Sequence, residues 1–101
     1  MKLLILTAVK TYEKEAIGLF KTAQINAFSS ADINGFKTED HENLIDNWFS
    51  SSSDKMRSLM FFSFTDEKKI DQLLIELEKL NKNLSESNPI RAIVLNIEKF
   101  L

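Results

Sequence analysis

One histidine and its acidic neighbours make the clearest candidate for metal chemistry in the sequence. His41 is the single histidine of the chain, and Glu39, Asp40 and Glu42 flank it. Imidazole nitrogen and carboxylate oxygen both bind divalent metal ions, and a neighbouring subunit could complete such a site. Adjacent donors lack the spacing of a metal-binding motif, however, so a solvated acidic loop is the favoured interpretation. His41, Glu39 and Asp40 are the candidate metal ligands.

Two adjacent large aromatic residues interrupt a polar stretch of the chain. Trp48 and Phe49 stand just before four serines and, if exposed, would present a large apolar area. They could insert into a protein partner, because Trp is over-represented among the residues that dominate binding energy. Alternatively, a helical turn containing Leu44 and Ile45 could fold them back onto the protein or onto a neighbouring subunit. The sequence leaves both interpretations open.

No pattern in the sequence is typical of a catalytic site. It contains no nucleophile elbow, metalloprotease motif, P-loop or dinucleotide-binding glycine motif. The absence of cysteine excludes disulfides, thiolate metal sites and cysteine nucleophiles. A formal net charge of -2 gives no electrostatic reason to expect nucleic acid binding. We therefore expect that the protein is not an enzyme.

Hydrophobic periodicity indicates the elements that must position these residues. The 101 residues are expected to form a single domain, residues 1–101. Apolar spacing and turn residues predict the following elements in order: a strand over 3–9, a helix that Thr11 can cap, a strand over 27–36, a long loop over about 37–57, a strand over 58–65, a helix opened by Asp66 and ended before Pro89, and a strand over 90–100. A loop as long as 37–57 in a small domain is usually functional.

The N-terminal apolar run is interpreted as a strand and not as part of a signal peptide. Residues 3–9 lead directly into Lys10, with no small-residue cleavage site between them. No other stretch of the sequence is long enough to span a membrane. We expect a cytoplasmic protein that does not insert into the membrane by itself.

The order of elements predicts an α+β fold of the ferredoxin-like βαββαβ type, with a four-stranded antiparallel sheet and two helices on one face. Two predicted strands carry consecutive apolar residues, at 59–62 and 93–95. Consecutive side chains of a strand point to opposite faces, so the face without helices must be apolar too. Such a face usually marks association, and we predict an oligomer.

The chain resembles the nitrogen regulatory PII family and its PII-like relatives. The resemblance covers nearly all of the chain and lies in Met1-Lys2 before an apolar strand, Ile25 before the second strand, Asn34-Gly35-Phe36 at the base of the long loop, and residues 93–98, similar to the family's last core strand. The resemblance implies a homotrimer that acts in signal transduction. It also implies that loop 37–57 engages a partner, such as a membrane transporter or its regulator, while nucleotides bind between subunits and set the loop's conformation.

Departures from the family pattern concern the nucleotide site. Lys37 stands where PII proteins usually have a second glycine, and residues 88–91 (Asn-Pro-Ile-Arg) replace a glycine-rich phosphate loop that ends in lysine. Pro89 has no N–H to offer a polyphosphate, and the family's basic tail is missing, so the standard ATP site is degenerate. Gly35, Lys37 and Arg91 remain the candidate ligand-binding residues. In the cleft between subunits, the two cations could hold a nucleotide or another anion, or they could be surface charges.

The main prediction is therefore a PII-like homotrimer that docks its long loop on a partner, gated by a small ligand between subunits. Two alternatives stay open. A metal-responsive trimer, similar to the CutA divalent-cation-tolerance family, would bind its ion through His41 and its acidic neighbours. A small ferredoxin-like dimeric enzyme would instead line a pocket with the aromatic residues.

Overall fold

The computed structural model describes residues 1–36, 55–84 and 88–101. Its elements are, in chain order, β1 (Lys2–Val9), the 3-10 helix η1 (Lys10–Tyr12), α1 (Glu13–Thr22), β2 (Ser29–Phe36), β3 (Lys55–Thr65), α3 (Glu67–Asn81) and β4 (Arg91–Asn96). This order confirms the predicted alternation of strands and helices, and with it the ferredoxin-like α+β fold.

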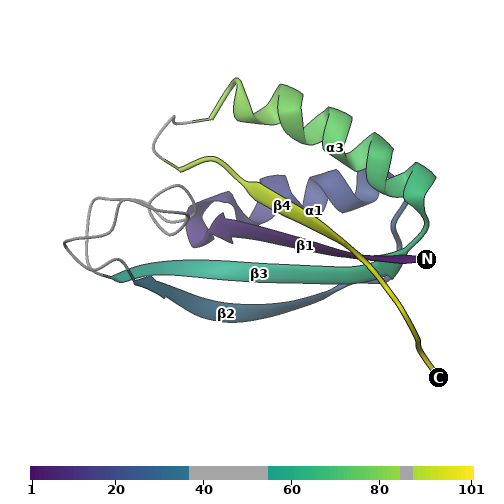
Figure 1. Ribbon diagram of the computed structural model, residues 1–101. Helices are drawn as coiled ribbons and strands as arrows, with labels where there is room; N and C mark the ends of the chain where they lie inside the picture. The colour runs from purple at the N-terminus through teal and green to yellow at the C-terminus, as the bar shows by residue number, and fades with distance from the viewer. Residues whose placement is uncertain (37–54, 85–87) are drawn as a thin grey trace.

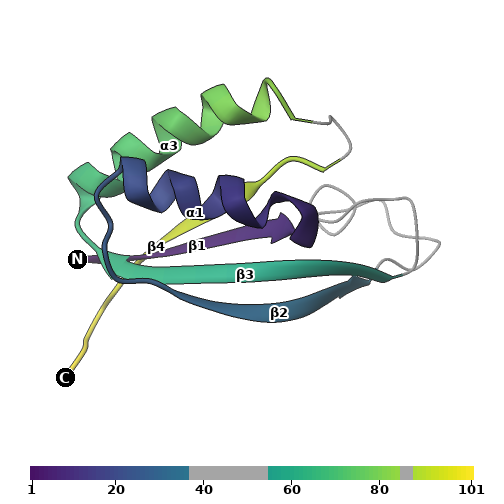
Figure 2. The ribbon, with the colours of Figure 1, turned by 180° about the vertical axis from the view of Figure 1, so that it is seen from behind.

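The four strands form one antiparallel sheet in the order β2-β3-β1-β4. β1 lies in the centre, where it pairs with β3 from Lys2↔Thr65 to Val9↔Ser58. On its other side it pairs with β4 from Lys2↔Asn96 to Thr7↔Arg91. Both helices pack on the same face of the sheet, so the opposite face has no helical layer (Figures 1 and 2). We call the opposite face the open face.

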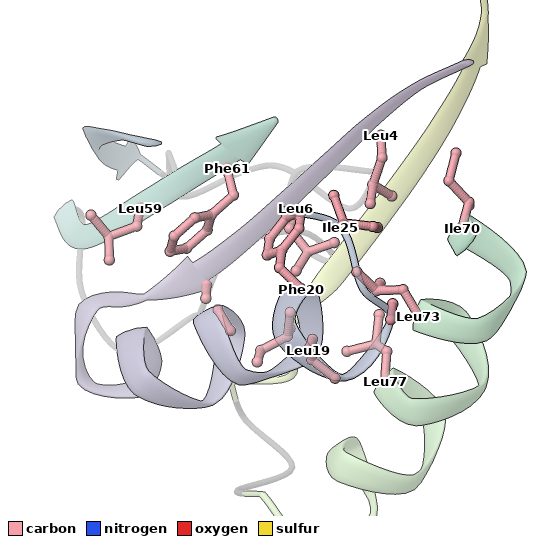
Figure 3. Close-up of a cluster of buried hydrophobic side chains, with 14 residues drawn as sticks. Leu4, Leu6, Leu19, Phe20, Ile25, Leu59, Phe61, Ile70, Leu73 and Leu77 are labelled. Carbon is pink, nitrogen blue, oxygen red and sulfur yellow. The ribbon is translucent and has the colours of Figure 1, made fainter. Parts of the chain in front are cut away.

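The hydrophobic core lies between the sheet and the two helices (Figure 3). Its buried members come from β1, α1, β3 and α3, from the turn after α1 and from the residue before β4: Leu4, Leu6, Ala8, Ala16, Leu19, Phe20, Ala23, Ile25, Leu59, Phe61, Ile70, Leu73, Leu77 and Ile90. The ring of Phe20 stacks on Phe28 with centroids 4.3 Å apart and meets Phe61 at 5.8 Å. Because apolar residues recur at helical spacing in α1 and α3, each helix buries one stripe against the sheet.

Helix α3 forms as its sequence predicts. Asp66 caps it, because its carboxylate accepts a hydrogen bond from the Lys69 backbone N–H at 3.0 Å. On its inner face Ile70, Leu73 and Leu77 are buried, and Leu74 and Leu80, with Leu84 just after the helix, pack half-buried against the core.

Helix α1 ends in a left-handed turn. Gln24 has a φ of 59°. The N–H of Gln24 donates to the Lys21 carbonyl at 3.0 Å, and the N–H of Ile25 donates to the Phe20 carbonyl at 2.9 Å. This pair of bonds is the Schellman pattern of helix ends, in which glycine usually takes the left-handed position. The turn directs Ile25 into the core.

Several sequence-based boundaries were wrong, among them the start of β2, which is Ser29 and not residue 27. Thr11 does not cap α1, since it lies inside η1, and Tyr12 takes the N-cap position without a side-chain hydrogen bond. β3 begins at Lys55 and not at residue 58, because its first residues pair with the end of β2. β4 ends at Asn96 and not at residue 100, because its partner β1 begins at Lys2, opposite Asn96.

Candidate functional site

The open face of the sheet is largely apolar. Paired residues of antiparallel strands point to the same face, so the register defines rows of side chains across the sheet. The row formed by Leu95, Leu3 and Phe64 lies at one end, and the row formed by Ile93, Ile5 and Phe62 lies next to it. Phe62 and Phe64 meet edge to face at 6.2 Å. Phe64 is 56% exposed and Leu95 is 45% exposed, so this surface is uncovered in the single chain.

The other end of the open face carries polar side chains. Arg91, the first residue of β4, pairs with Thr7 of β1, which is only 7% exposed. Ser58 of β3 is also buried and pairs with the next open-face position of β1. Within the strand residues that the structure describes, Arg91 is the single charged residue at an open-face position. A lone guanidinium in an apolar surface is a natural place to hold an anion.

Two polar atoms near Arg91 lack a hydrogen-bond partner among the described residues. They are the Nε of Arg91 itself and the Oδ1 of Asn88, and both are buried. A buried donor or acceptor without a partner costs free energy, so such atoms are uncommon in folded proteins. The start of β4 therefore has unused capacity to donate and accept hydrogen bonds.

Asn81 fixes the position of this segment. Its side-chain amide donates to the Ile90 carbonyl at 3.0 Å, and its Oδ1 accepts from the Ile90 N–H at 3.0 Å. The side chain thus makes the two bonds that a neighbouring strand would make. Ile90 is buried in the core, so Arg91, the next residue, starts β4 from a rigid anchor.

The predicted ligand residues lie on opposite edges of the sheet and in different rows. Gly35 pairs with Met56 near the end of the edge strand β2, and Arg91 begins the other edge strand, β4. Three strand spacings separate them across the sheet, about 14 Å, and four residues separate their rows along the strands, about 13 Å. Gly35 is buried and its φ is not positive, so its backbone conformation does not require glycine. Within one chain, these two residues do not meet.

All other predicted site residues lie outside the described residues. These are Lys37 of the ligand set, Glu39, Asp40 and His41 of the metal set, and Leu44, Ile45, Trp48 and Phe49 of the partner-binding set. The described ranges contain no group of three histidine or acidic side chains that could hold a metal ion. In the same ranges no helix combines the length and apolarity needed to cross a membrane.

The sequence analysis missed Thr7, Ser58 and Asn81. Thr7 is the one polar residue in the apolar run 3–9, and that interruption was a usable signal. Asn81 had no comparable signal, because its partner Ile90 lies nine residues away across the turn between α3 and β4.

Comparison with known proteins supports the fold. No protein-family model matches the sequence, and no curated protein matches it. Solved structures do match. One is CPII, a nitrogen regulatory PII-like protein from Thiomonas intermedia K12, bound to ADP, AMP and bicarbonate. It has a TM-score of 0.58 and 10% identity, covering 99% of this chain and 94% of that chain.

Two further structures are similar. A protein from Thermus thermophilus, whose name describes it as PII-like, has a TM-score of 0.61 and 14% identity over 95% of this chain and 85% of its own. A DUF3240 family protein from Shewanella baltica OS155 has a TM-score of 0.60 and 18% identity over 98% of this chain and 91% of its own. The chain therefore has the fold of PII-like proteins along nearly its whole length, which confirms the predicted resemblance at the level of fold.

Proposed function

We propose that this protein is a PII-like regulatory protein. It works as a homotrimer whose segment 37–54, between β2 and β3, docks on a protein partner. A small anionic ligand bound between subunits gates this docking. The observation that carries the proposal is the open face, which joins an apolar surface to a lone, half-buried cation, Arg91, on a PII-like fold.

The apolar part of the open face supports association of identical chains. Phe62, Phe64 and Leu95 lie on one continuous surface with Leu3 and Ile5 of the central strand. Apolar patches of this kind on a single chain mark interaction sites, and a stable interface buries roughly 800 Å² on each partner. The two apolar rows of the open face are available for that purpose.

The polar end of the same face supports a ligand between subunits. Gly35 and Arg91 lie on opposite edges of one sheet, so only different chains can bring the two edges together around one molecule. Lys37 follows Phe36, the last residue of β2, and adds a second positive charge near that edge. Arg91 can donate to phosphate or carboxylate oxygens. Pro89 offers no backbone donor, so the ligand is a nucleotide or another small anion held mainly by side chains.

The partner is a protein, such as a membrane transporter or its regulator. Leu44, Ile45, Trp48 and Phe49 supply the contacts, and Trp48 is the residue type that most often dominates such interfaces. The role is regulatory and not catalytic, and the protein works in the cytoplasm without inserting into the membrane.

Native mass spectrometry tests this function directly. The purified protein is measured alone and with ATP, ADP, AMP, cyclic nucleotides and divalent metal ions. We expect a trimer that takes up one anion per subunit. Arg91→Gln should weaken this uptake about tenfold or more, because a charge-assisted hydrogen bond contributes roughly 1.5–3 kcal/mol. Arg57→Gln is the matched control, since Arg57 points to the helix-covered face of β3, and it should bind as the wild type does.

The same experiment separates the alternatives. Uptake of zinc, copper or nickel that His41→Ala abolishes would replace the anion sensor by a metal-responsive trimer. A dimer would overturn the trimeric assembly and favour the small-enzyme alternative. A trimer that binds nothing would limit the function to partner docking.

A further inference from the structure

The segment after β4 carries apolar side chains away from the body of the protein. β4 ends at Asn96, and residues 97–101 continue past the sheet on the side opposite the helices (Figures 1 and 2). Phe100 is 71% exposed, and Leu101 is fully exposed. Large apolar side chains on a projecting segment are costly to leave in water, so the segment has apolar surface to bury.

The open face is least covered at the end from which this segment leaves. The row of Leu95, Leu3 and Phe64, which we call the distal row, lies next to the end of β4. Both of its outer members are exposed, whereas Thr7 at the opposite end of β1 is buried. The Phe64 ring meets the Phe62 ring of the next row edge to face. The distal row is therefore an apolar surface that the folded single chain already exposes.

The segment does not cover its own distal row. Phe64 and Leu95 keep their exposure although residues 97–101 are present in the structure. Between the segment and the N-terminus lies an open hollow of about 700 Å³, lined by Met1, Ile97, Glu98, Lys99, Phe100 and Leu101. The projecting segment thus offers both exposed apolar side chains and a hollow that they line.

We propose that residues 97–101 form an arm that packs Phe100 and Leu101 on the distal row of a second copy of this chain. The inference rests on the proposed association of copies through the open face, and it assigns the segment that covers the distal row. The arm continues β4, whose Ile93 and Leu95 lie on the open face, so it extends the same apolar interface. Each copy therefore contributes both a distal row and an arm to the assembly.

A spin-label experiment locates the arm. The chain has no cysteine, so a nitroxide can be placed at one site through Lys99→Cys. Chains that carry the nitroxide but no nitrogen-15 are mixed with nitrogen-15 chains that carry no nitroxide, and the two are left to exchange subunits. Any broadening of an amide signal then comes from a nitroxide on another copy. We expect the strongest broadening at the amides of Leu3, Phe64 and Leu95. A label at Ile75→Cys, on the exposed face of α3, is the control and should leave these amides sharp. Strongest broadening elsewhere would overturn the arm contact.

Dilution measurements test how much the arm contributes. Phe100→Ser combined with Leu101→Ser should raise the dissociation constant of the oligomer by about tenfold or more, because fully burying one large apolar side chain is worth that much. Ile75→Ser is the control and should not change it. Equal dissociation of the arm variant and the wild type would overturn the arm and leave the assembly standing. A wild type that is monomeric at every concentration would overturn the assembly and the arm together.

Discussion

The two faces of this sheet are built from the same strands but have different surroundings. In β3, Phe61 points to the helices and is 1% exposed, while its neighbours Phe62 and Phe64 point to the open face. In β1, Leu4 and Leu6 are covered, whereas Leu3 and Ile5 are only half-buried. The side chains are of the same kind on both faces. Apolar character therefore predicts that a face needs cover, and the number of helices decides whether the chain can supply it.

The largest expected effect comes from removing one aromatic ring on each face. Phe61→Ala should lower the free energy of unfolding by about 3–5 kcal/mol at every protein concentration, because it opens a cavity against Phe20 and Phe28. Phe62→Ala removes the same atoms from the open face, so its effect should grow with protein concentration as copies associate. Urea denaturation at a low and a high concentration measures both. If both variants lost the same free energy of unfolding in the dilute monomer, the two faces would not differ in how they stabilise the single chain.

A smaller effect is expected at Asn81, which supports both faces at once by anchoring buried Ile90 and, through it, Arg91. Asn81→Ala should cost about 1–3 kcal/mol, because it leaves the Ile90 N–H and carbonyl without their partner. Asn83→Ala is the control. Its amide makes only a long, exposed contact of 3.5 Å with the Lys79 carbonyl, and it should cost less than about 0.5 kcal/mol. Thermal unfolding distinguishes them, and equal shifts of Tm would remove the anchoring role of Asn81.

The smallest expected effect is a gain in stability, and it concerns the turn that ends α1 on the helix-covered face. Gln24→Gly should stabilise the protein by about 0.5–1 kcal/mol, because glycine adopts the left-handed conformation of this turn without steric cost. Lys21→Gly, in the last turn of α1, should destabilise it by a similar amount. Both shifts should be the same at all protein concentrations. A loss of stability in Gln24→Gly would show that the glutamine side chain has its own stabilising contact.

Local patterns predicted the elements of the fold well, because the relevant forces act over a few residues. The stripe of Ile70, Leu73 and Leu77 and the cap at Asp66 are both contained in one helix. The open face was also predictable, since consecutive apolar residues in a strand must face both ways. By contrast, the end of β4 depends on where β1 begins, and Ile97 and Phe100 carry the apolar pattern of β4 past that point.

The candidate site was predictable only in part for the same reason. The family resemblance pointed to Gly35, near the end of β2, and to Arg91, at the start of β4. Their separation on opposite edges follows from the strand order, which no local pattern contains. Thr7 became part of the site only through its pairing with Arg91 on the neighbouring strand.

The paired hydrogen bonds between Asn81 and Ile90 also give the protein a place where sequence can be added. They close the chain between these residues into a ring whose two ends are fixed independently of what joins them. Doubling the length of such a connection costs only about 0.6 kcal/mol of closure entropy. An epitope or a fluorescent reporter inserted between Leu84 and Asn88 should therefore leave the β4 strand in register, because Leu84 keeps its place on the core and Asn88 keeps its place before β4.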